Sequence, residues 1–284
     1  MRIALLTHAC DPELRPGFFW KPERIYMIQG ILEVMRQRGH TCRICRGLDR
    51  RLPKADVAIA HVDCSITPAE YADALSAYPL VINGKVTDIT KRRISRHLLS
   101  PDSEWPGPVL VKSNLNCGGF PEETQNRNAA RQGRPLPHPG NRPVREYRIY
   151  DRLPLVPDTV WDDPALVVEK FLPEQEEDGY ALRNWVFFGE KERCTRHTAR
   201  HPLVKGEGVI RSEPCPVPRS LRDARTRLGI DYGKIDFVMH GGEAVLLDVN
   251  RTPGSAERLS AFLEQGAAHL ADGLEAMMTA RSTA

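Results

Sequence analysis

Long apolar runs are missing from this chain of 284 residues. No segment approaches the roughly 20 consecutive apolar residues that a membrane-spanning helix requires, so we expect no membrane partner. The opening segment, MRIALLTHACDPELRPG, becomes acidic and proline-bearing after a short apolar stretch, and it has no small-residue cleavage pattern. These features predict a cytoplasmic protein without a signal peptide.

A strong charge of one sign and a framework of paired cysteines are missing too. The formal net charge of +3 is too small to indicate nucleic acid by itself, so we expect no nucleic-acid partner. The seven cysteines are scattered along the chain, which predicts free thiols in a reducing compartment. Cys42 and Cys45 form a lone C-x-x-C. A redox or zinc pair is one interpretation, but zinc normally needs further ligands, which favours two partly buried thiols.

Two common phosphate-binding fingerprints are also absent. The first predicted strand is followed by THACDPELRPG, where a dinucleotide-binding domain would carry G-x-G-x-x-G. The glycine-bearing segment VLVKSNLNCGGF does not contain G-x-x-x-x-G-K-[ST]. The sequence therefore argues against a dinucleotide-binding domain and against a Walker A loop.

The elements that are present predict a mixed α/β protein. With 41% hydrophobic residues, the chain can form one large domain or two to three small ones. Strand and helix patterns alternate over the first 90 residues, which predicts a small α/β layer with a largely parallel sheet. Hairpins are predicted with turns at Gly189 and at HGGE. Helices are predicted at residues 22–40, 67–78 with Thr67 as N-cap, 88–98, 218–230 and 255–280.

Residues 121–148 form a polar segment that contains prolines and many arginines. Such a composition predicts an excursion or a mobile loop over the surface. Its arginines either are solvated or belong to a flap that meets an anionic ligand.

The last hairpin, KIDFVMHGGEAVLLDVNRTPG, carries acids on otherwise apolar strands. Residues two apart share a face of a strand, so Lys234 lies with Asp236, and Asp248 lies with Asn250. Pairing across the turn can bring Asp236 beside Asp248. Two like charges would repel each other unless a cation lies between them, and these oxygen ligands suit Mg²⁺. The alternative is an exposed hairpin end that happens to be acidic.

Two earlier segments carry further chemistry. Lys112 ends an apolar strand before a Gly-Gly loop, whose backbone N–H groups can approach phosphate oxygens; alternatively, it closes an edge strand before a turn. In LVVEKFL, an apolar strand is interrupted by Glu169 and Lys170. This segment can offer backbone groups and an apolar wall to an adenine ring, or it is an ordinary strand exit.

Taken in chain order, DITKR, VLVKSNLNCGG, VVEKFLPE, YALRNWVFFG and the last hairpin resemble the ATP-grasp superfamily over nearly the whole chain. The resemblance implies a fold that combines α/β and α+β parts, in which two α+β subdomains clamp ATP. The implied regions are an N-terminal α/β domain (1–90), a small subdomain with the glycine-rich loop (91–172) and a C-terminal subdomain with the metal site (173–284).

The same resemblance assigns roles to individual residues. ATP would be bound by Lys91, Lys112, Gly118, Gly119, Glu169, Lys170, Phe171, Leu172 and Glu176, with Glu174 and Glu177 as competitors of Glu176 for the ribose. Magnesium would be bound by Asp236, Asp248 and Asn250, and the catalytic residues would be Lys234, Arg183 and Arg251. Two departures from the family pattern are Asp248, where most members have Glu, and the polar stretch after the glycine-rich loop.

The implied reaction is the ADP-forming ligation of a carboxylate to an amine through an acyl phosphate, with ATP and Mg²⁺. The implied partners are a small-molecule carboxylate and an amine, and a homodimer is compatible with the resemblance. The acid is expected near Arg183, Arg251 and the basic segment RCTRHTARHPLVK, with His197, Arg200 and Lys205 as candidates unless this hairpin is simply solvated. Alternatives are an ATP-grasp kinase that phosphorylates a hydroxyl group and a non-catalytic nucleotide-binding protein.

Overall fold

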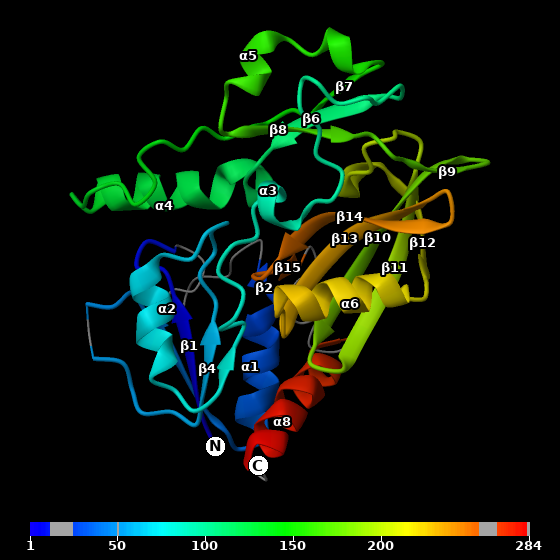
Figure 1. The fold of residues 1–284 in the computed structure, drawn as a ribbon. Coiled ribbons are helices and arrows are strands. Elements are labelled where there is room, and N and C mark those ends of the chain that lie inside the picture. Colours follow the sequence, from blue (N-terminus) through cyan, green and yellow to red (C-terminus); the bar gives the residue numbers. More distant parts are fainter. Residues whose placement is uncertain (12–24, 50, 256–265, 283–284) are drawn as a thin grey trace.

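The computed structural model describes residues 1–11, 25–49, 51–255 and 266–282. The described residues form three main sheets, which occupy separate regions in Figure 1, and residues of two of these sheets line a cleft. In that view the N-terminal sheet lies at the lower left, the smallest sheet at the top and the largest sheet at the right. This mixed α/β architecture agrees with the fold class that the sequence predicts.

The N-terminal sheet is entirely parallel, as predicted. β1 and β4 are buried along almost their whole length, which is typical of parallel strands covered on both faces. Its strands, in spatial order, are β3 (Thr41–Arg46), β1 (Arg2–Thr7), β4 (Val57–Ala60) and β5 (Val81–Ile82). The flanking helices are α1 (Met27–Gln37) and α2 (Ala69–Ser76).

Two helix starts in this region differ from the prediction. The chain forms the short strand β2 (Ile25–Tyr26) before α1, so this helix begins at Met27, and residues 22–24 lie outside the described residues. Pro68, and not Thr67, precedes α2 as its N-cap residue. The Thr67 hydroxyl accepts a hydrogen bond from Arg251 at 2.6 Å instead. A tertiary contact has therefore replaced the local cap.

The small sheet contains β7 (Arg148–Tyr150), β6 (Val109–Ser113) and β8 (Leu166–Lys170), all antiparallel. It is preceded by α3 (Lys91–Ile94), a single turn where a longer helix was predicted. The chain becomes extended at Ser95 because Leu98 pairs with Glu169 of β8 in an isolated bridge. Shorter elements in this region are η1 (Asn116–Gly119), η2 (Leu153–Leu155) and α5 (Asp158–Trp161).

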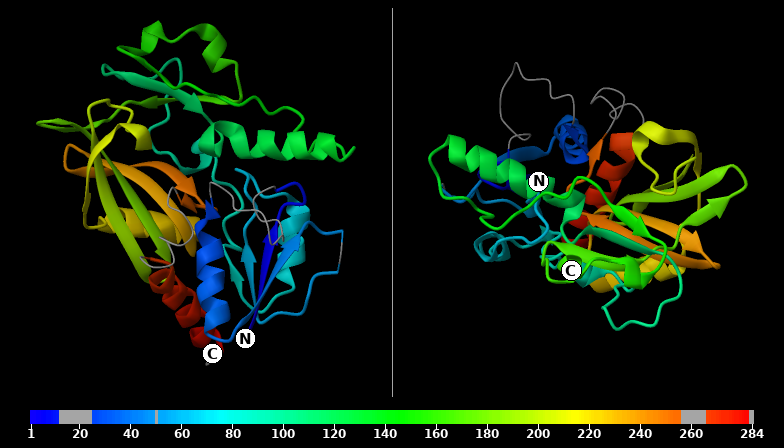
Figure 2. Two further views of the ribbon diagram at one scale, coloured as in Figure 1. Left: turned by 180° about the vertical axis from the view of Figure 1, so that it is seen from behind. Right: turned by 90° about the horizontal axis from the view of Figure 1, so that it is seen from above.

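The prediction of an excursion or mobile loop at residues 121–148 is wrong for its first half. These residues form α4 (Phe120–Arg131), which lies across the N-terminal sheet in Figures 1 and 2. Its buried face is polar: Gln125 donates to the carbonyl of Asp63 at 2.6 Å, and Asn128 donates to the carbonyl of Cys10 at 3.0 Å. Hydrophobic periodicity does not reveal a helix that packs through amides.

The large sheet is antiparallel and forms one wall of the cleft. Gly241 and Gly242 connect its last two strands with positive φ angles of 57° and 83°, as a tight hairpin turn requires. Its strands, in spatial order, are β12 (Val209–Pro214), β11 (Lys191–Ala199), β10 (Gly179–Phe188), β13 (Tyr232–His240) and β14 (Glu243–Asn250), while β9 (Glu174–Glu176) also pairs with β10. Both predicted hairpins are thus confirmed.

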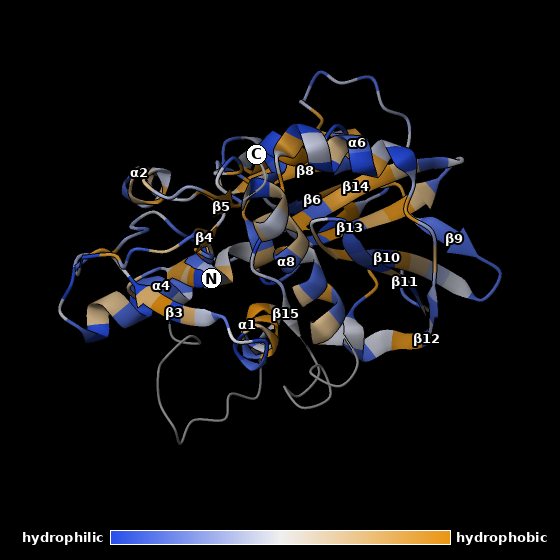
Figure 3. Cartoon of the chain, turned by 90° about the horizontal axis from the view of Figure 1, so that it is seen from below, coloured by the Kyte–Doolittle hydropathy of each residue, from blue (hydrophilic) through white to orange (hydrophobic). Residues whose placement is uncertain are grey.

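The outer face of the large sheet packs on α6 (Arg219–Leu228), and Trp185, Phe187 and Phe237 form part of the core between them. In Figure 3, α6 shows alternating hydrophilic and hydrophobic segments, as expected for a helix with one buried face. The strand β15 (Gly254–Ser255) pairs with β2. The 3₁₀ turn η3 (Gly206–Gly208) precedes β12.

The final helix α8 (Ala268–Ser282) joins the large sheet to the N-terminal layer. It packs in one hydrophobic core with α1 and with Val186 and Phe188 of β10. Residues 256–265 of the predicted helix lie outside the described residues. The predicted division into residues 1–90, 91–172 and 173–284 stays a prediction. None of the described helices has both the length and the apolarity needed to cross a bilayer.

Candidate nucleotide and metal site

A cavity of about 210 Å³ lies between the small and large sheets. We call it the cleft cavity. The apolar part of its wall includes Leu110 of β6 and Val238 of β13. The sequence-predicted site residues that line it are Lys91, Lys112, Glu169, Lys170, Phe171, Leu172, Asp236 and Asp248. Residues from five distant segments therefore converge on one space.

Two lysines point into the cleft cavity from the small-sheet side. On β6, Val109 and Val111 face the hydrophobic core, so the twofold period of the strand directs Lys112 to the opposite face. The Lys112 ammonium lies 2.7 Å from Glu169 Oε2 and donates to the carbonyl of Leu247 at 3.0 Å. Lys91, at the start of α3, lies 2.6 Å from Asp248 Oδ1. Both side chains are almost fully buried, and each charge has an acidic partner, as burial of a charge requires.

Glu169 has an unused acceptor in this cavity. One carboxylate oxygen pairs with Lys112, whereas Oε1 is buried and has no hydrogen-bond partner. Phe171 and Leu172 line the same space. An orphan acceptor beside apolar side chains fits a flat ring that carries an N–H donor, such as adenine, because a buried acceptor without a donor is unfavourable. The residues present therefore fit a purine nucleotide.

Tyr147 also lines the cleft cavity, and the sequence analysis missed it. Burial raises the pKa of its phenol, and the charges of Asp248 and Glu169 act in the same direction. Tyr147 lies in the polar segment that follows the glycine-rich loop. No local motif distinguishes it there; only the pairing of β7 with β6 returns this part of the chain to the site.

Two carboxylates face each other across the last hairpin. Asp236 of β13 is directly opposite Asp248 of β14, so both side chains lie on the same face of the sheet. Lys234 Nζ lies 2.9 Å from Asp236 Oδ2. Burial alone would lower the pKa of Lys234, but Asp236 and Asp248 outweigh this effect and raise it. Each acid of the pair is thus already neutralised by a lysine.

Asn250 is opposite Lys234 in the same register. Its side-chain oxygen accepts hydrogen bonds from the backbone N–H of Thr252 at 2.8 Å and from the Thr252 hydroxyl at 3.2 Å. Across the described ranges, no three His, Cys, Asp or Glu side chains are grouped to hold a metal ion. The candidate donor set is therefore two carboxylates and one amide, whose hard oxygens suit Mg²⁺ when water and phosphate complete the coordination.

Arg183 lies on the other side of the large sheet and does not line the cleft cavity. Leu182 and Asn184 of β10 face the cleft side, whereas Arg183 shares its face with Trp185 in the core beneath α6. Its guanidinium forms an ion pair with Glu174 at 2.6 Å. The interpretation of Arg183 as a catalytic residue is not supported by this placement, because strand parity turns it away from the phosphates.

The side chain of Arg251 is buried and forms hydrogen bonds that hold neighbouring loops together. It is 3% exposed and donates to the carbonyls of Cys64 at 2.8 Å and of Val86 at 2.5 Å, in addition to the Thr67 hydroxyl. These bonds attach loops of the N-terminal layer to the end of β14. Burial lowers the pKa of Arg251. Its place among carbonyl groups, outside the wall of the cleft cavity, does not fit the catalytic role expected for it.

The acid expected for the ribose is also engaged elsewhere. Glu176 pairs with Arg196 at 2.7 Å and with Arg211 at 3.1 Å. Neither it nor its competitors Glu174 and Glu177 line the cleft cavity. The structure therefore does not bring a ribose-binding acid from this segment to the other predicted residues.

The glycine-rich loop is covered by the chain that follows α4. Gly118 and Gly119 have positive φ angles of 68° and 78°. The carbonyl of Gly118 accepts from the Val144 N–H at 2.8 Å, and the carbonyl of Gly119 accepts from Asn141 at 3.0 Å. A Cβ atom on Gly118 would lie 2.6 Å from the carbonyl oxygen of Val144. Glycine is required here by the turn and by this close cover, and neither residue lines the cleft cavity.

A second cavity of about 660 Å³ extends over the same face of the large sheet, and we call it the basic cavity. It shares Leu182, Val204 and Lys205 with the cleft cavity. Its wall also contains Arg193 and His197. Burial lowers the pKa of His197, so the imidazole is neutral near pH 7. The candidates His197 and Lys205 are therefore brought to the cleft, whereas Arg200 is exposed and lines neither cavity.

Comparison with known proteins supports the fold. No family model and no curated protein matches the chain. The solved structure of the ATP-grasp ligase PsnB, complexed with a minimal precursor, matches with a TM-score of 0.51 at 13% identity over 99% of this chain and 98% of that one. The chain thus has the ATP-grasp fold that its motifs predict.

Two further solved structures match over nearly their whole length. A RimK domain protein ATP-grasp from Sphaerobacter thermophilus has a TM-score of 0.49 at 16% identity, over 96% of this chain and 99% of that one. The D-alanine–D-alanine ligase from Bacillus anthracis has a TM-score of 0.48 at 13% identity, over 100% of this chain and 99% of that one.

Proposed function

We propose that this protein is an ATP-dependent, ADP-forming ligase that joins a carboxylate to an amine or a similar nucleophile. The observation that carries the proposal is the convergence of Lys91, Lys112, Asp236 and Asp248 on the cleft cavity. Phosphoryl transfer depends mainly on positioning and charge neutralisation. The two lysines, together with a cation held by the two facing carboxylates, can position the phosphates and neutralise their charge.

In this proposal the adenine ring lies against Phe171 and Leu172, and its exocyclic amine donates to the orphan oxygen of Glu169. The phosphates extend toward Lys112 and Lys91. The proposal uses the two glycines of the loop for backbone conformation only, because the chain at Asn141 and Val144 covers them.

Asp236, Asp248 and Asn250 would hold the magnesium ion. When bound, Mg²⁺ supplies neutralisation of the phosphate charge. Lys91 now contacts Asp248, so it exchanges this partner for a phosphate oxygen when the nucleotide binds. Aspartate is shorter than the glutamate that most members of the resembled superfamily carry, which favours one metal ion close to β14.

The acid substrate is expected in the basic cavity, with Lys205 and Lys234 near its reacting end. A carboxylate oxygen attacks the γ-phosphorus and forms a new O–P bond, while the bond from phosphorus to the β,γ-bridging oxygen breaks and ADP leaves. The amine nitrogen then attacks the acyl carbon, and the bond to the phosphate oxygen breaks. Inorganic phosphate leaves with that electron pair, and the amine proton passes to solvent.

A hydroxylamine trap tests this proposal. The protein is incubated with MgATP, pools of small carboxylic acids and hydroxylamine, and hydroxamate and ADP are both measured. A ligase forms hydroxamate and ADP in equal amounts with a particular acid, because hydroxylamine intercepts an activated acyl group. ADP formation with a stable phosphate ester and without hydroxamate identifies a kinase instead.

The matched variants are Asp248→Ala and Asp223→Ala. Asp223 is an exposed aspartate on α6, away from the cleft, and its replacement should leave product formation unchanged. Asp248→Ala should abolish it. Full turnover in Asp248→Ala contradicts the metal assignment, and the absence of nucleotide binding to the wild-type protein contradicts the proposal as a whole.

A further inference from the structure

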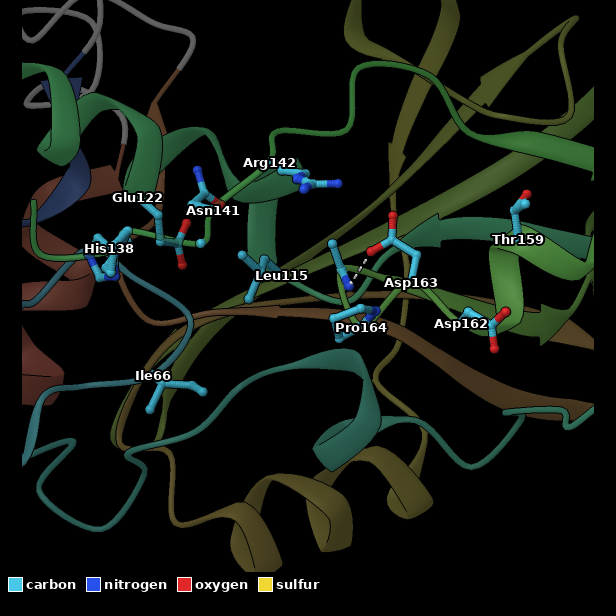
Figure 4. Close-up of a pocket in the computed structure, with 13 residues that line it drawn as sticks. Ile66, Leu115, Glu122, His138, Asn141, Arg142, Thr159, Asp162, Asp163 and Pro164 are labelled. Carbon is cyan, nitrogen blue, oxygen red and sulfur yellow. Dashed lines mark hydrogen bonds between the residues drawn. The ribbon is translucent and has the colours of Figure 1, made fainter.

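A third cavity, of about 680 Å³, is lined by residues near the glycine-rich loop, such as Leu115 and Asn141, and by residues around α5. It shares no lining residue with the cleft cavity or the basic cavity. Figure 4 shows Glu122, His138 and Asn141 gathered at one end, Thr159 and Asp162 at the other, and Leu115 and Pro164 between them. This cavity is thus bounded by α4, the chain after it and α5.

Glu122 is the distinctive group of this cavity. Its side chain is buried, with 3% exposure. Oε1 accepts the backbone N–H of Ser65 at 2.6 Å, while Oε2 is buried and has no hydrogen-bond partner. A buried carboxylate oxygen without a donor is costly, so this position favours a ligand that brings a charged N–H group.

The charged side chains of the cavity also favour a positively charged ligand. Asp162 and Asp163 line it together with Glu122, against the single guanidinium of Arg142. In Figure 4 Arg142 lies beyond Asn141 as seen from Glu122. Burial lowers the pKa of His138, so this imidazole does not add a positive charge near pH 7. The residues that line the cavity therefore carry more negative than positive charge.

The remaining wall suits an aliphatic chain. Leu115 and Pro164 lie along the middle of the cavity, and the nearby Ile66 is 55% exposed. An exposed isoleucine beside a hollow offers apolar contact area to a ligand. We propose that this cavity binds an aliphatic primary ammonium group, with the ammonium donating to Glu122 Oε2 and the methylene groups packed on Leu115, Ile66 and Pro164.

This binding site does not depend on the proposed ligase activity. Pentane-1,5-diamine is a suitable probe, and pentane-1,5-diol is its uncharged match in length. We expect calorimetric titration at pH 7 to detect the diamine and not the diol. Binding should weaken as salt increases, because both partners are charged.

Glu122→Gln is the decisive variant, since its side-chain oxygen can still accept from Ser65 while the charge is removed. Loss of a charge-assisted hydrogen bond should weaken diamine binding about tenfold or more. Glu123→Gln, one residue along α4 and outside the cavity wall, should bind as the wild type does.

A melting temperature of Glu122→Gln close to that of the wild type shows that the variant is folded. If it is unstable, Asp162→Asn at the exposed end of the cavity provides a second test, with an expected loss of about threefold or more. Equal affinity of the wild type and the folded variants for the diamine, or equal binding of the diol, overturns the inference. MgATP binding, measured in parallel, should be unaffected, so failure of this proposal is distinguishable from failure of the ligase proposal.

Discussion

The ion pair between Lys112 and Glu169 should matter strongly for stability as well as for nucleotide binding. Its atoms lie 2.7 Å apart, and the two side chains are 4% and 5% exposed. Replacing Lys112 by methionine keeps the apolar stem and leaves a buried carboxylate without its cation. Breaking a buried pair in this way costs about 3–5 kcal/mol, so we expect the free energy of unfolding of Lys112→Met to fall by that amount.

A double-mutant cycle measures the pair directly. Urea unfolding is followed for Lys112→Met, Glu169→Gln and the variant that carries both changes. The double variant should be more stable than the sum of the single losses indicates, with a coupling of about 0.5–3 kcal/mol. The matched control is Arg134→Met, which removes a surface pair with Asp49, where the side chains are 45% and 67% exposed; it should cost less than about 1 kcal/mol.

The same variants separate stability from function. The double variant has no buried uncompensated charge, but it lacks the cation that would meet the phosphates. It should therefore regain stability relative to Lys112→Met without regaining affinity for MgATP. A loss below about 1 kcal/mol in Lys112→Met, together with no measurable coupling to Glu169→Gln, would refute the reasoning from burial.

Three further predictions concern other parts of the site. Asp248→Ala should abolish ADP formation while its circular dichroism spectrum stays native; turnover at the wild-type rate is the contrary result. Arg183→Met should lower the melting temperature because Glu174 remains buried and unpaired, yet the KM for ATP should change less than about twofold, and a large rise in KM contradicts its placement outside the cleft. Burial raises the pKa of Asp63 to about 7, above its unfolded value of about 3.9, so the folded state binds the extra proton. This contribution to stability is complete below about pH 4 and is lost as the pH rises to about 7; the decline should be smaller in Asp63→Asn, and identical pH profiles of urea midpoints would contradict it.

Local signals were sufficient for the parts of the fold that depend on sequence neighbours. Apolar strands predicted the parallel sheet, and Gly241 and Gly242 predicted the turn that joins β13 to β14. Counted from that turn alone, Asp236 would face Leu247, but a register shift between Asp236 and Phe237 places it opposite Asp248 instead. The facing of the two acids therefore depends on this bulge, which the turn residues alone do not predict.

Strand parity explains why Arg183 lies outside the cleft cavity. A family motif indicates that an arginine lies near a site, but it does not fix the face of the strand. A shift of one residue along a strand moves a side chain from the cleft face to the core face. Arg183 lies between Leu182 and Asn184, both of which line the basic cavity, and consequently turns away. Asn184, which donates to Asp236, is the residue that the motif brings to the cleft, and alternation along β10 was the signal that could have identified it.

The helix α4 was missed for a different physical reason. Its buried positions are Glu122, Gln125, Asn126, Asn128 and Ala129, which follow helical spacing but have almost no hydrophobic signal. Polar groups can be buried when they find partners, and the partners of Gln125 and Asn128 are the backbone carbonyls of Asp63 and Cys10 in distant loops. Such partners cannot be read from the helix itself.

If the proposed function is correct, the charges of the cleft would couple the binding of the nucleotide to the binding of the cation. Lys91, Lys112 and Lys234 each pair with one acid, namely Asp248, Glu169 and Asp236, so these six groups balance without a ligand. A triphosphate adds several negative charges to that balanced set. A lysine that turns to the phosphates leaves its carboxylate unpaired, and a divalent ion at Asp236 and Asp248 restores the neutrality that the lysine removed. In the proposed function, a metal ion that replaces a lysine at these acids would therefore bind more readily when phosphates occupy the cleft.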